Sequence, residues 1–498
     1  MSKESNEPKE IGNNTESELE DIFLLASTYP KAELIFKNHK LLEEIKDECL
    51  FVVDTNALLI PYKQNPATLD GIEKVYLNLV SQNRLFIPGH VAREFAKNRV
   101  YKVKNIHESL SQKKDNFNQS IKTIERDQIE SSSLIRSLEG YQEILDIERK
   151  MAEEIDNINK IINSLITEYE EKYKKTIDKV LKKIADWNWN DPVSLMYAKV
   201  FANDVVIDPH FDKEEVKRDM KWRNQHKIPP GFKDASKGSN SVGDLLIWKT
   251  ILFIGNNHKK DVVFVSGETK SDWWLRSHNS KLLYPRYELV DEFRRSSEGQ
   301  SFHMIKLSDL LSWYGADDSV IKEVRQEEEQ ISLRKIKEEK RILLMKARKA
   351  VNEWLLEENK YQRVEKRIQE RIPFRIKRSF IDSVFMDEAG NKTAIKIEVV
   401  LANLIYARFE VIESIKKTIT NFKLTMAGVE MLQQGVSQLM LVFVGNSEDT
   451  AVQAEVFVKD ADFEEWYLEF FRKISCVFGY LDNESKFKPT SELIIKNS

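Results

Sequence analysis

Three acidic residues that are far apart in the sequence stand where helices are expected to begin. Asp54 directly follows the apolar run Leu50–Val53, Glu94 lies in the first turn of an expected helix, and Asp244 precedes a strongly apolar helix. Taken singly, each fits a helix N-cap or a charge that the helix dipole favours. If they belong to one sheet domain they can converge, and carboxylates held close together stay ionised at neutral pH only with cations between them.

The ligand types decide which cation this would be. Oxygen-only ligands favour Mg²⁺ or Mn²⁺ over zinc, and the sequence has no cluster of cysteines and histidines that competes for the role. A paired-cation site activates water and stabilises a leaving oxygen, which is a common way of cleaving phosphodiesters. The three acids therefore point to metal-dependent hydrolysis of a phosphodiester bond.

Short apolar runs alternate with helical segments around these acids. The runs are Leu50–Val53, 85–87, Val262–Val265 and Phe302–Ile305. This alternation predicts an α/β fold with a mostly parallel sheet flanked by helices, in which functional groups gather beyond the carboxyl ends of the strands. We also expect a helix directly after each of the last two runs.

A long helical insertion is expected between the two halves of this domain. Residues 101–187 contain no proline, and apolar residues such as Ile155, Ile158, Ile162 and Leu165 recur at helical spacing. This stripe predicts an antiparallel helical hairpin, with its turn near 131–133 or Gly140. A stalk that packs on itself is the simplest interpretation; a nucleic-acid arm or a coiled-coil dimer contact is the alternative.

The remaining segments show no chemical motif. A charged stretch predicts a linker helix, and the strand-like and helical segments after it predict a small α+β domain with a hairpin from 439–444 and 451–458 and a closing helix at 463–474. The predicted layout is a disordered tail at 1–17, the α/β domain at 18–317 with its hairpin at 101–187, the linker helix at 318–372, and the α+β domain at 373–498.

Net charge, cysteine positions and the length of apolar stretches exclude some classes of protein. The formal net charge of the 498 residues is −4, which excludes binding of nucleic acid through bulk positive charge. Cys49 and Cys476 lie far apart among apolar residues, as expected for buried thiols in the reducing cytoplasm. No stretch approaches the ~20 apolar residues of a membrane span, so we expect no membrane partner.

Several ordered motifs resemble a known family. The run VDTNAL at 53–58 resembles the first motif of PIN-domain nucleases, and PGHVAREF at 88–95 resembles the second. Four further motifs resemble the bacterial PIN-like subgroup that has a long helical insertion. They are WR at 222–223, IPPGFKD at 228–234, GDLLIW at 243–248 and KSDWW at 270–274. The resemblance covers roughly half of the chain and says nothing of the rest.

The resemblance implies a Mg²⁺- or Mn²⁺-dependent endonuclease in which Asp54, Glu94 and Asp244 are catalytic metal ligands. The family places a further aspartate just after the strand equivalent to Val262–Val265, where this chain has Glu268, with Asp272 four residues on. At that spacing the two acids could share one helical face, and either could complete the site. The departure leaves open an altered second metal site.

Other residues near these motifs have supporting roles. Asn56 and Ser266 are expected to orient ligands or water. Phosphates of the substrate would be neutralised by basic residues close to the acidic motifs, namely Arg223, Lys233, Lys237 and Lys270. The resemblance favours RNA over DNA as the substrate.

Two other interpretations belong to different functional classes. The PIN-like domain could be catalytically silent and serve as a nucleic-acid-binding or assembly module; the glutamate at position 268 keeps this alternative open. The C-terminal domain could instead restrain the nuclease, as in a toxin-like or phage-defence effector. A regulatory partner or a second copy of the chain would then bind through the helical hairpin or the C-terminal domain.

Overall fold

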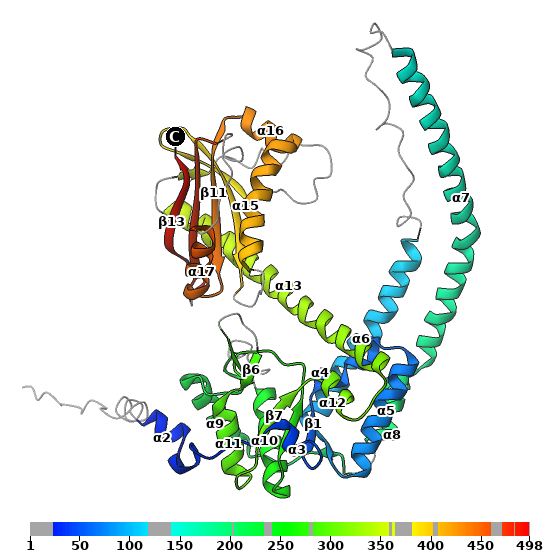
Figure 1. The fold of residues 1–498 in the computed structure, drawn as a ribbon, viewed down its shortest axis with the longest axis vertical. Coiled ribbons are helices and arrows are strands. Elements are labelled where there is room, and N and C mark those ends of the chain that lie inside the picture. Colours follow the sequence, from blue (N-terminus) through cyan, green and yellow to red (C-terminus); the bar gives the residue numbers. More distant parts are fainter. Residues whose placement is uncertain are drawn as a thin grey trace, which may run out of the picture. The chain divides into compact units, whose positions relative to one another are not determined.

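The computed structural model describes residues 23–117, 141–201, 204–233, 242–277, 282–357, 361–363, 381–401, 407–459, 471–482 and 484–497. Two compact units make up the chain. The first comprises Met1–Glu268 and Glu288–Arg325, and the second comprises Thr269–Tyr287 and Gln326–Ser498. Figure 1 labels many of their elements.

The first unit is built on a five-stranded parallel sheet in the order β3-β2-β1-β4-β7. Its strands are β1 (Leu50–Val53), β2 (Leu85–Pro88), β3 (Val206–Ile207), β4 (Val262–Val265) and β7 (Phe302–Ile305). Every residue of β1, β2 and β4 is buried, as expected for parallel strands covered on both faces. The predicted mostly parallel α/β fold is therefore confirmed.

Helices flank this sheet and connect its strands. They are α2 (Leu24–Thr28), α3 (Leu42–Ile45), α4 (Thr55–Leu58), α5 (Pro66–Ser81), α6 (Gly89–Asp115), α8 (Pro192–Val200), α9 (Lys213–His226), α10 (Val242–His258), α11 (Tyr287–Ser296) and α12 (Leu307–Trp313), with 3-10 turns at Ala32–Leu34 and Ile60–Lys63. Helices α10 and α11 approach so closely that a Cβ atom at Gly255 would lie 2.4 Å from the Phe293 ring. Only glycine fits at this crossing.

The segment after β4 differs from the prediction. A helix follows β7, but residues 266–270 have no regular structure, and a turn at 271–273 leads into the antiparallel pair β5 (Trp274–Arg276) and β6 (Leu282–Pro285). The expectation that Glu268 and Asp272 share a helical face is therefore wrong. The backbone N–H of Glu268 donates to Oγ of Ser266, a local bond that competes with helical hydrogen bonding.

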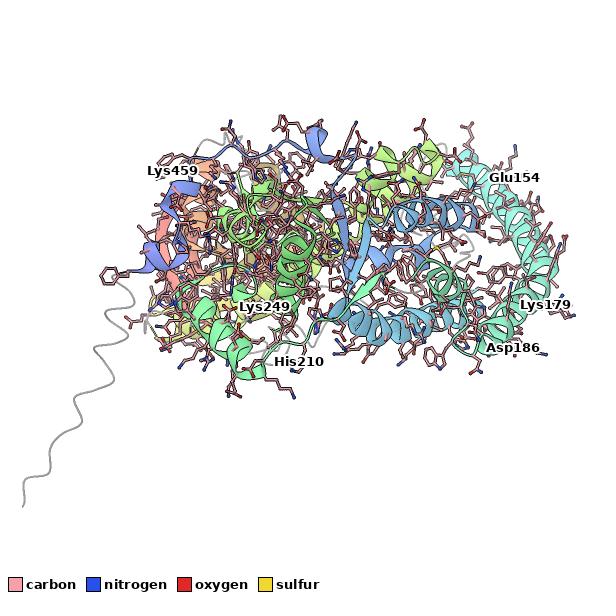
Figure 2. All side chains as sticks on the ribbon, turned by 90° about the horizontal axis from the view of Figure 1, so that it is seen from below. Glu154, Lys179, Asp186, His210, Lys249 and Lys459 are labelled. Atoms are coloured by element: carbon pink, nitrogen blue, oxygen red, sulfur yellow. The ribbon has the colours of Figure 1, made fainter. Side chains whose placement is uncertain are left out.

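The predicted insertion at 101–187 contains the later part of α6 and the long helix α7 (Tyr141–Asp186), and the two helices lie side by side in Figure 1. The rings of Phe117 and Tyr173 are 4.7 Å apart, and Nζ of Lys114 is 2.5 Å from Oδ1 of Asp178. Figure 2 shows side chains along α7 from Glu154 to Asp186. The turn predicted near 131–133 or Gly140 lies outside the described residues.

The apolar stripe of α7 is only partly covered. Ile155 is 8% exposed, whereas Ile158 and Leu165 are 43% and 48% exposed. The predicted helix is thus present over this stretch, although its apolar positions do not all face the same partner.

The second unit contains a mixed sheet in the order β13-β12-β11-β10-β9-β8. Its strands are β8 (Tyr361–Arg363), β9 (Ser383–Asp387), β10 (Lys392–Val400), β11 (Val436–Gly445), β12 (Lys473–Leu481) and β13 (Phe487–Asn497). The three central strands β10, β11 and β12 are parallel to one another, and the outer strands are antiparallel to their neighbours.

Helices cover both faces of this sheet. One face packs against α15 (Ala407–Leu424), α16 (Met426–Gln433) and α17 (Glu448–Lys459). The other face packs against the second half of α13 (Asp318–Glu357) through Ala347, Val351 and Leu355. The charged helix ends at Glu357 rather than near Ile372, and its second half is part of a hydrophobic core.

Two expectations for this unit are wrong. The predicted hairpin partner at 451–458 lies in α17, so the segment forms a crossover helix between parallel strands. Lys473 and Ile474, expected at the end of a closing helix, begin strand β12. The part of that expected helix at 463–470 lies outside the described residues.

Candidate metal centre

The carboxylate of Asp54 stands at the carboxyl end of β1, in the middle of the parallel sheet. It caps α4 by accepting a 2.7 Å hydrogen bond from the backbone N–H of Thr55 at Oδ1. Its Oδ2 accepts from Asn56 Nδ2 at 2.9 Å and from Ser266 Oγ at 2.6 Å. Asn56 and Ser266, the residues expected to orient ligands, therefore both contact Asp54.

Glu268 reaches this place through the end of the neighbouring strand β4. The hydroxyl of Ser266 donates to Asp54 and also accepts the backbone N–H of Glu268 at 3.0 Å. Glu268 is only 9% exposed. One serine thus connects the two acids that follow adjacent strands.

Glu94 lies one turn inside α6. Its Oε2 accepts a 2.7 Å hydrogen bond from Thr55 Oγ1, and its Oε1 is 3.4 Å from His90 Nε2. The first turn of α10 lies against the same two side chains, because a Cβ atom at Gly243 would be 2.8 Å from His90 Nε2 and 3.3 Å from Glu94 Oε1. The residue next to this glycine is Asp244, so α6 and α10 bring their acidic residues close to the start of α4, which Asp54 caps.

The charges of these acids act on one another. The pKa of Asp54 is raised from 3.8 to about 6, mainly by burial and also by the negative charges of Glu268, Asp244 and Glu94, while the hydrogen bond from Ser266 lowers it. Asp54 is thus close enough to Glu94, Asp244 and Glu268 for each of their charges to act on it. Their oxygen ligands suit a hard divalent cation.

The described residues do not include a finished ligand set. Among them, no group of three or more His, Cys, Asp and Glu side chains has the arrangement that would hold a metal ion. Glu94 instead bonds to Thr55. The acids are neighbours that lack the arrangement of a metal site.

The raised pKa gives a pH dependence to the stability of the metal-free protein. Between about pH 4 and pH 6 the folded state holds a proton on Asp54 that the unfolded state has lost, so stability falls as pH rises through this window. The total loss attributable to Asp54 approaches ~3 kcal/mol. Urea unfolding at several pH values, with chelator present, would measure this loss. The free energy of unfolding should fall more steeply with pH between pH 4 and pH 6 in the wild type than in Asp54→Asn, and an equal dependence on pH would contradict the expectation.

Asp272 occupies a different setting from Glu268. It is fully buried in the turn at 271–273 before β5, within the second compact unit. Of the two acids considered for the fourth position, Glu268 is the one whose charge raises the pKa of Asp54.

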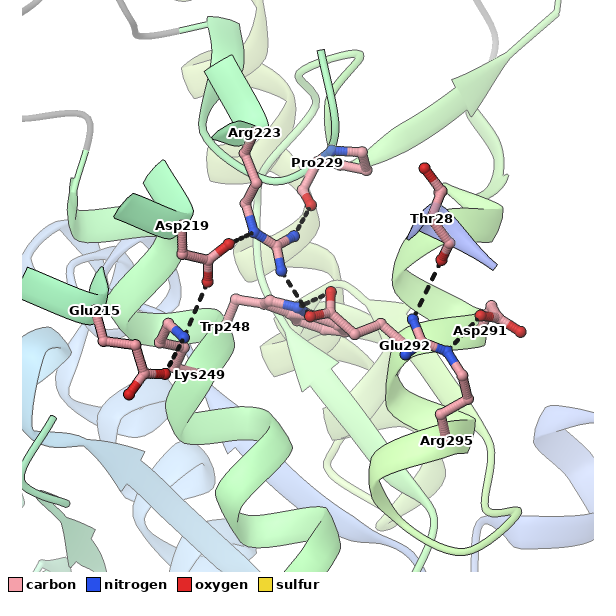
Figure 3. Close-up of polar contacts among 10 residues, drawn as sticks. All are labelled: Thr28, Glu215, Asp219, Arg223, Pro229, Trp248, Lys249, Asp291, Glu292 and Arg295. Atoms are coloured by element: carbon pink, nitrogen blue, oxygen red, sulfur yellow. Dashed lines mark hydrogen bonds and ion pairs between the residues drawn. The ribbon is translucent and has the colours of Figure 1, made fainter. Parts of the chain in front are cut away.

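The prediction that Arg223 binds phosphate is wrong, because its guanidinium already serves a buried network (Figure 3). Arg223 is 5% exposed and donates to Asp219 Oδ1 at 2.8 Å, to Glu292 Oε1 at 2.6 Å and to the backbone oxygen of Pro229. The indole N–H of Trp248 donates to the other oxygen of Glu292 at 2.8 Å. The network joins α9, α10 and α11.

For the three lysines predicted to bind phosphate, that role stays a prediction. Lys233 is exposed, and Lys270 is partly buried in the second compact unit. Lys237 lies outside the described residues.

Sequence reasoning missed two residues of this centre, Thr55 and His90. Both occur inside the motifs that pointed to Asp54 and Glu94, and His90 stands four residues before Glu94, the spacing that places two side chains on one helical face. That spacing was the available signal.

Comparison with known proteins gives one match. Residues 50–289 match the family model described as PIN like domain. No curated protein and no solved structure matches the chain. Separately, none of the helices among the described residues combines the length and the apolar character that a bilayer crossing requires.

Proposed function

Because residues 50–289 of this chain belong to the PIN-like family, we propose that the first unit is a metal-dependent endonuclease that hydrolyses phosphodiester bonds of RNA. The observation that carries the proposal is the gathering of Glu94, Asp244 and Glu268 around the buried Asp54, whose pKa their charges raise. Buried acids that repel one another are stabilised when a cation binds among them.

Each acid has a defined part in this proposal. Asp54 is held by three donors, so its carboxylate is oriented before any ligand arrives. Glu94, Asp244 and Glu268 supply further oxygens from α6, α10 and the end of β4. A bound Mg²⁺ or Mn²⁺ would activate water and stabilise the leaving oxygen.

The neighbouring polar groups keep these acids in position. Thr55 binds Glu94, and Ser266 connects Asp54 to the backbone of Glu268. Such contacts fix ligand orientation, and their loss is expected to weaken metal binding by about 10–100-fold. Glu268 takes the fourth acidic position in this proposal.

One observation favours the alternative of a silent nucleic-acid-binding module. Among the described residues, no three His, Cys, Asp or Glu side chains are arranged so that they could hold a metal ion. In an active enzyme, cation binding supplies the free energy that turns Glu94 and Asp244 inward; in a silent module, no such site forms.

Calorimetric titration with Mn²⁺ separates the two. The wild type should show a binding site, and Asp244→Ala should weaken it by about 100-fold or more, since a direct ligand matters at least as much as the groups that orient it. Asp318→Ala is the matched control, because Asp318 is an exposed acid in the first turn of another helix, α13. A wild type that binds no Mn²⁺ would contradict the enzyme proposal.

A further inference from the structure

The face of α6 that carries His90 and Glu94 continues beyond the metal centre. With 100° of rotation per residue, Lys97, Tyr101 and Lys104 follow these two residues at spacings of three and four and so lie on the same face. Tyr101 stands seven residues from Glu94, about 10 Å along the helix axis. We call Lys97, Tyr101 and Lys104 the α6 stripe.

The side chains of the α6 stripe are available to a partner. Tyr101 is 58% exposed, the Lys104 side chain is 63% exposed, and Lys97 is also exposed. The aromatic residue on the other side of the same helix behaves differently: Phe95 stacks with Tyr62 and packs against Tyr197. The core therefore takes up one aromatic of α6 and leaves the other at the surface.

Charge on this helix contrasts with the rest of the chain. Helix α6 has seven Lys and Arg residues against three Asp and Glu residues, whereas the whole chain has a formal net charge of −4. Lys104 makes only an exposed 3.5 Å pair with Glu108, which holds it weakly. A polyanion would find on α6 the positive charge that the chain as a whole lacks.

We propose that the α6 stripe binds a single strand of nucleic acid and leads it to the metal centre. This rests on the proposed function. The two lysines neutralise phosphates, and the ring of Tyr101 stacks on an unpaired base, the combination typical of single-strand binding surfaces. With 3.4 Å per stacked nucleotide, the base on Tyr101 lies about three nucleotides from the acids.

Fluorescence anisotropy measures the affinity of the protein for a labelled 20-nucleotide oligouridine. Chelator is present so that the RNA is not cut. Tyr101→Ala should weaken binding about tenfold, and Tyr101→Phe should keep the affinity because the stacking ring remains. Lys97→Ala combined with Lys104→Ala should lower the slope of log affinity against log salt by about 1.4.

The controls change similar side chains elsewhere. Tyr169→Ala removes a 48% exposed tyrosine from α7, and Lys175→Ala combined with Lys349→Ala removes two exposed lysines that, like Lys104, pair with a glutamate four residues away. Thermal unfolding of every variant shows whether it is folded. Equal effects of stripe and control variants would overturn the proposal.

Two further outcomes would also overturn it. If duplex RNA binds as tightly as the single strand and is equally sensitive to Tyr101→Ala, the ring does not stack on a base. If the wild type binds no nucleic acid, the stripe is not a binding surface for a nucleic-acid strand. Because binding is measured without metal, a wild type that binds through the stripe but cleaves nothing would contradict only the proposed function.

Discussion

Asp54→Asn should abolish Mn²⁺-stimulated cleavage of RNA, with a loss of at least about 10³-fold in rate, or ~4 kcal/mol of transition-state stabilisation. The amide keeps the size of the carboxylate and its single oxygen can still accept hydrogen bonds, but its NH2 group cannot accept those made to the second carboxylate oxygen, and it lacks the negative charge that a cation needs. Since the charged carboxylate is strained by burial and by its acidic neighbours, the metal-free variant should be at least as stable as the wild type at pH 7.

The measurement compares cleavage of single- and double-stranded RNA and DNA by wild type and variant, with Mn²⁺ and with chelator. Far-ultraviolet circular dichroism and urea unfolding verify that the variant is folded. Asp309→Asn is the matched control, because Asp309 also accepts a backbone hydrogen bond at the start of a helix that follows a strand of the same sheet. Cleavage that survives in Asp54→Asn would remove the metal centre from the mechanism, and cleavage of DNA alone would correct the substrate.

Arg223→Met should destabilise the folded protein by about 3–5 kcal/mol, because it leaves the carboxylates of Asp219 and Glu292 without their buried partner. Lys249 pairs with Asp219 at 2.9 Å and the Trp248 indole binds Glu292, so both acids keep one contact. This places the effect toward the lower end of that range. Methionine fills a similar volume, which limits the contribution of a cavity.

Urea unfolding gives the free energy, and Arg218→Met on the same helix is the control. Arg218 is exposed, and its replacement should change stability by less than ~0.5 kcal/mol. The salt dependence of RNA binding should be the same in both variants, since neither arginine meets phosphate in our account. If Arg223→Met kept its stability and bound RNA more weakly, Arg223 would be a phosphate-binding residue.

The parts of the fold that could be predicted from the sequence are those in which one local signal dominates. Leu50–Val53 and Val262–Val265 are wholly apolar because parallel strands are buried on both faces, and such runs are recognisable without knowing their partners. Asp54 could be placed because it ends one of these runs. Its convergence with Glu94 and Asp244 followed from the rule that functional groups gather at the carboxyl edge.

The errors occurred where two signals compete. The segment 451–458 contains four valine and phenylalanine residues that favour strands, yet Ala451, Ala454 and Val458 are buried at helical spacing in α17. Arg223 has the same charge whether it meets phosphate or a buried acid, and only the position of Glu292, 69 residues later, decides between them. Such long-range pairings leave no local mark in a sequence.

The crossing of α10 and α11 at Gly255 has a consequence for the opposite end of α10. A helix is stiff, and Asp244 precedes Gly255 by eleven residues, about 16 Å along the axis. A Cβ atom at Gly255 would require the Phe293 ring or one of the two helices to shift, and a shift of α10 would move Asp244. The absence of a side chain at Gly255 therefore sets how closely α10 packs against α11, and through α10 it contributes to the position of Asp244.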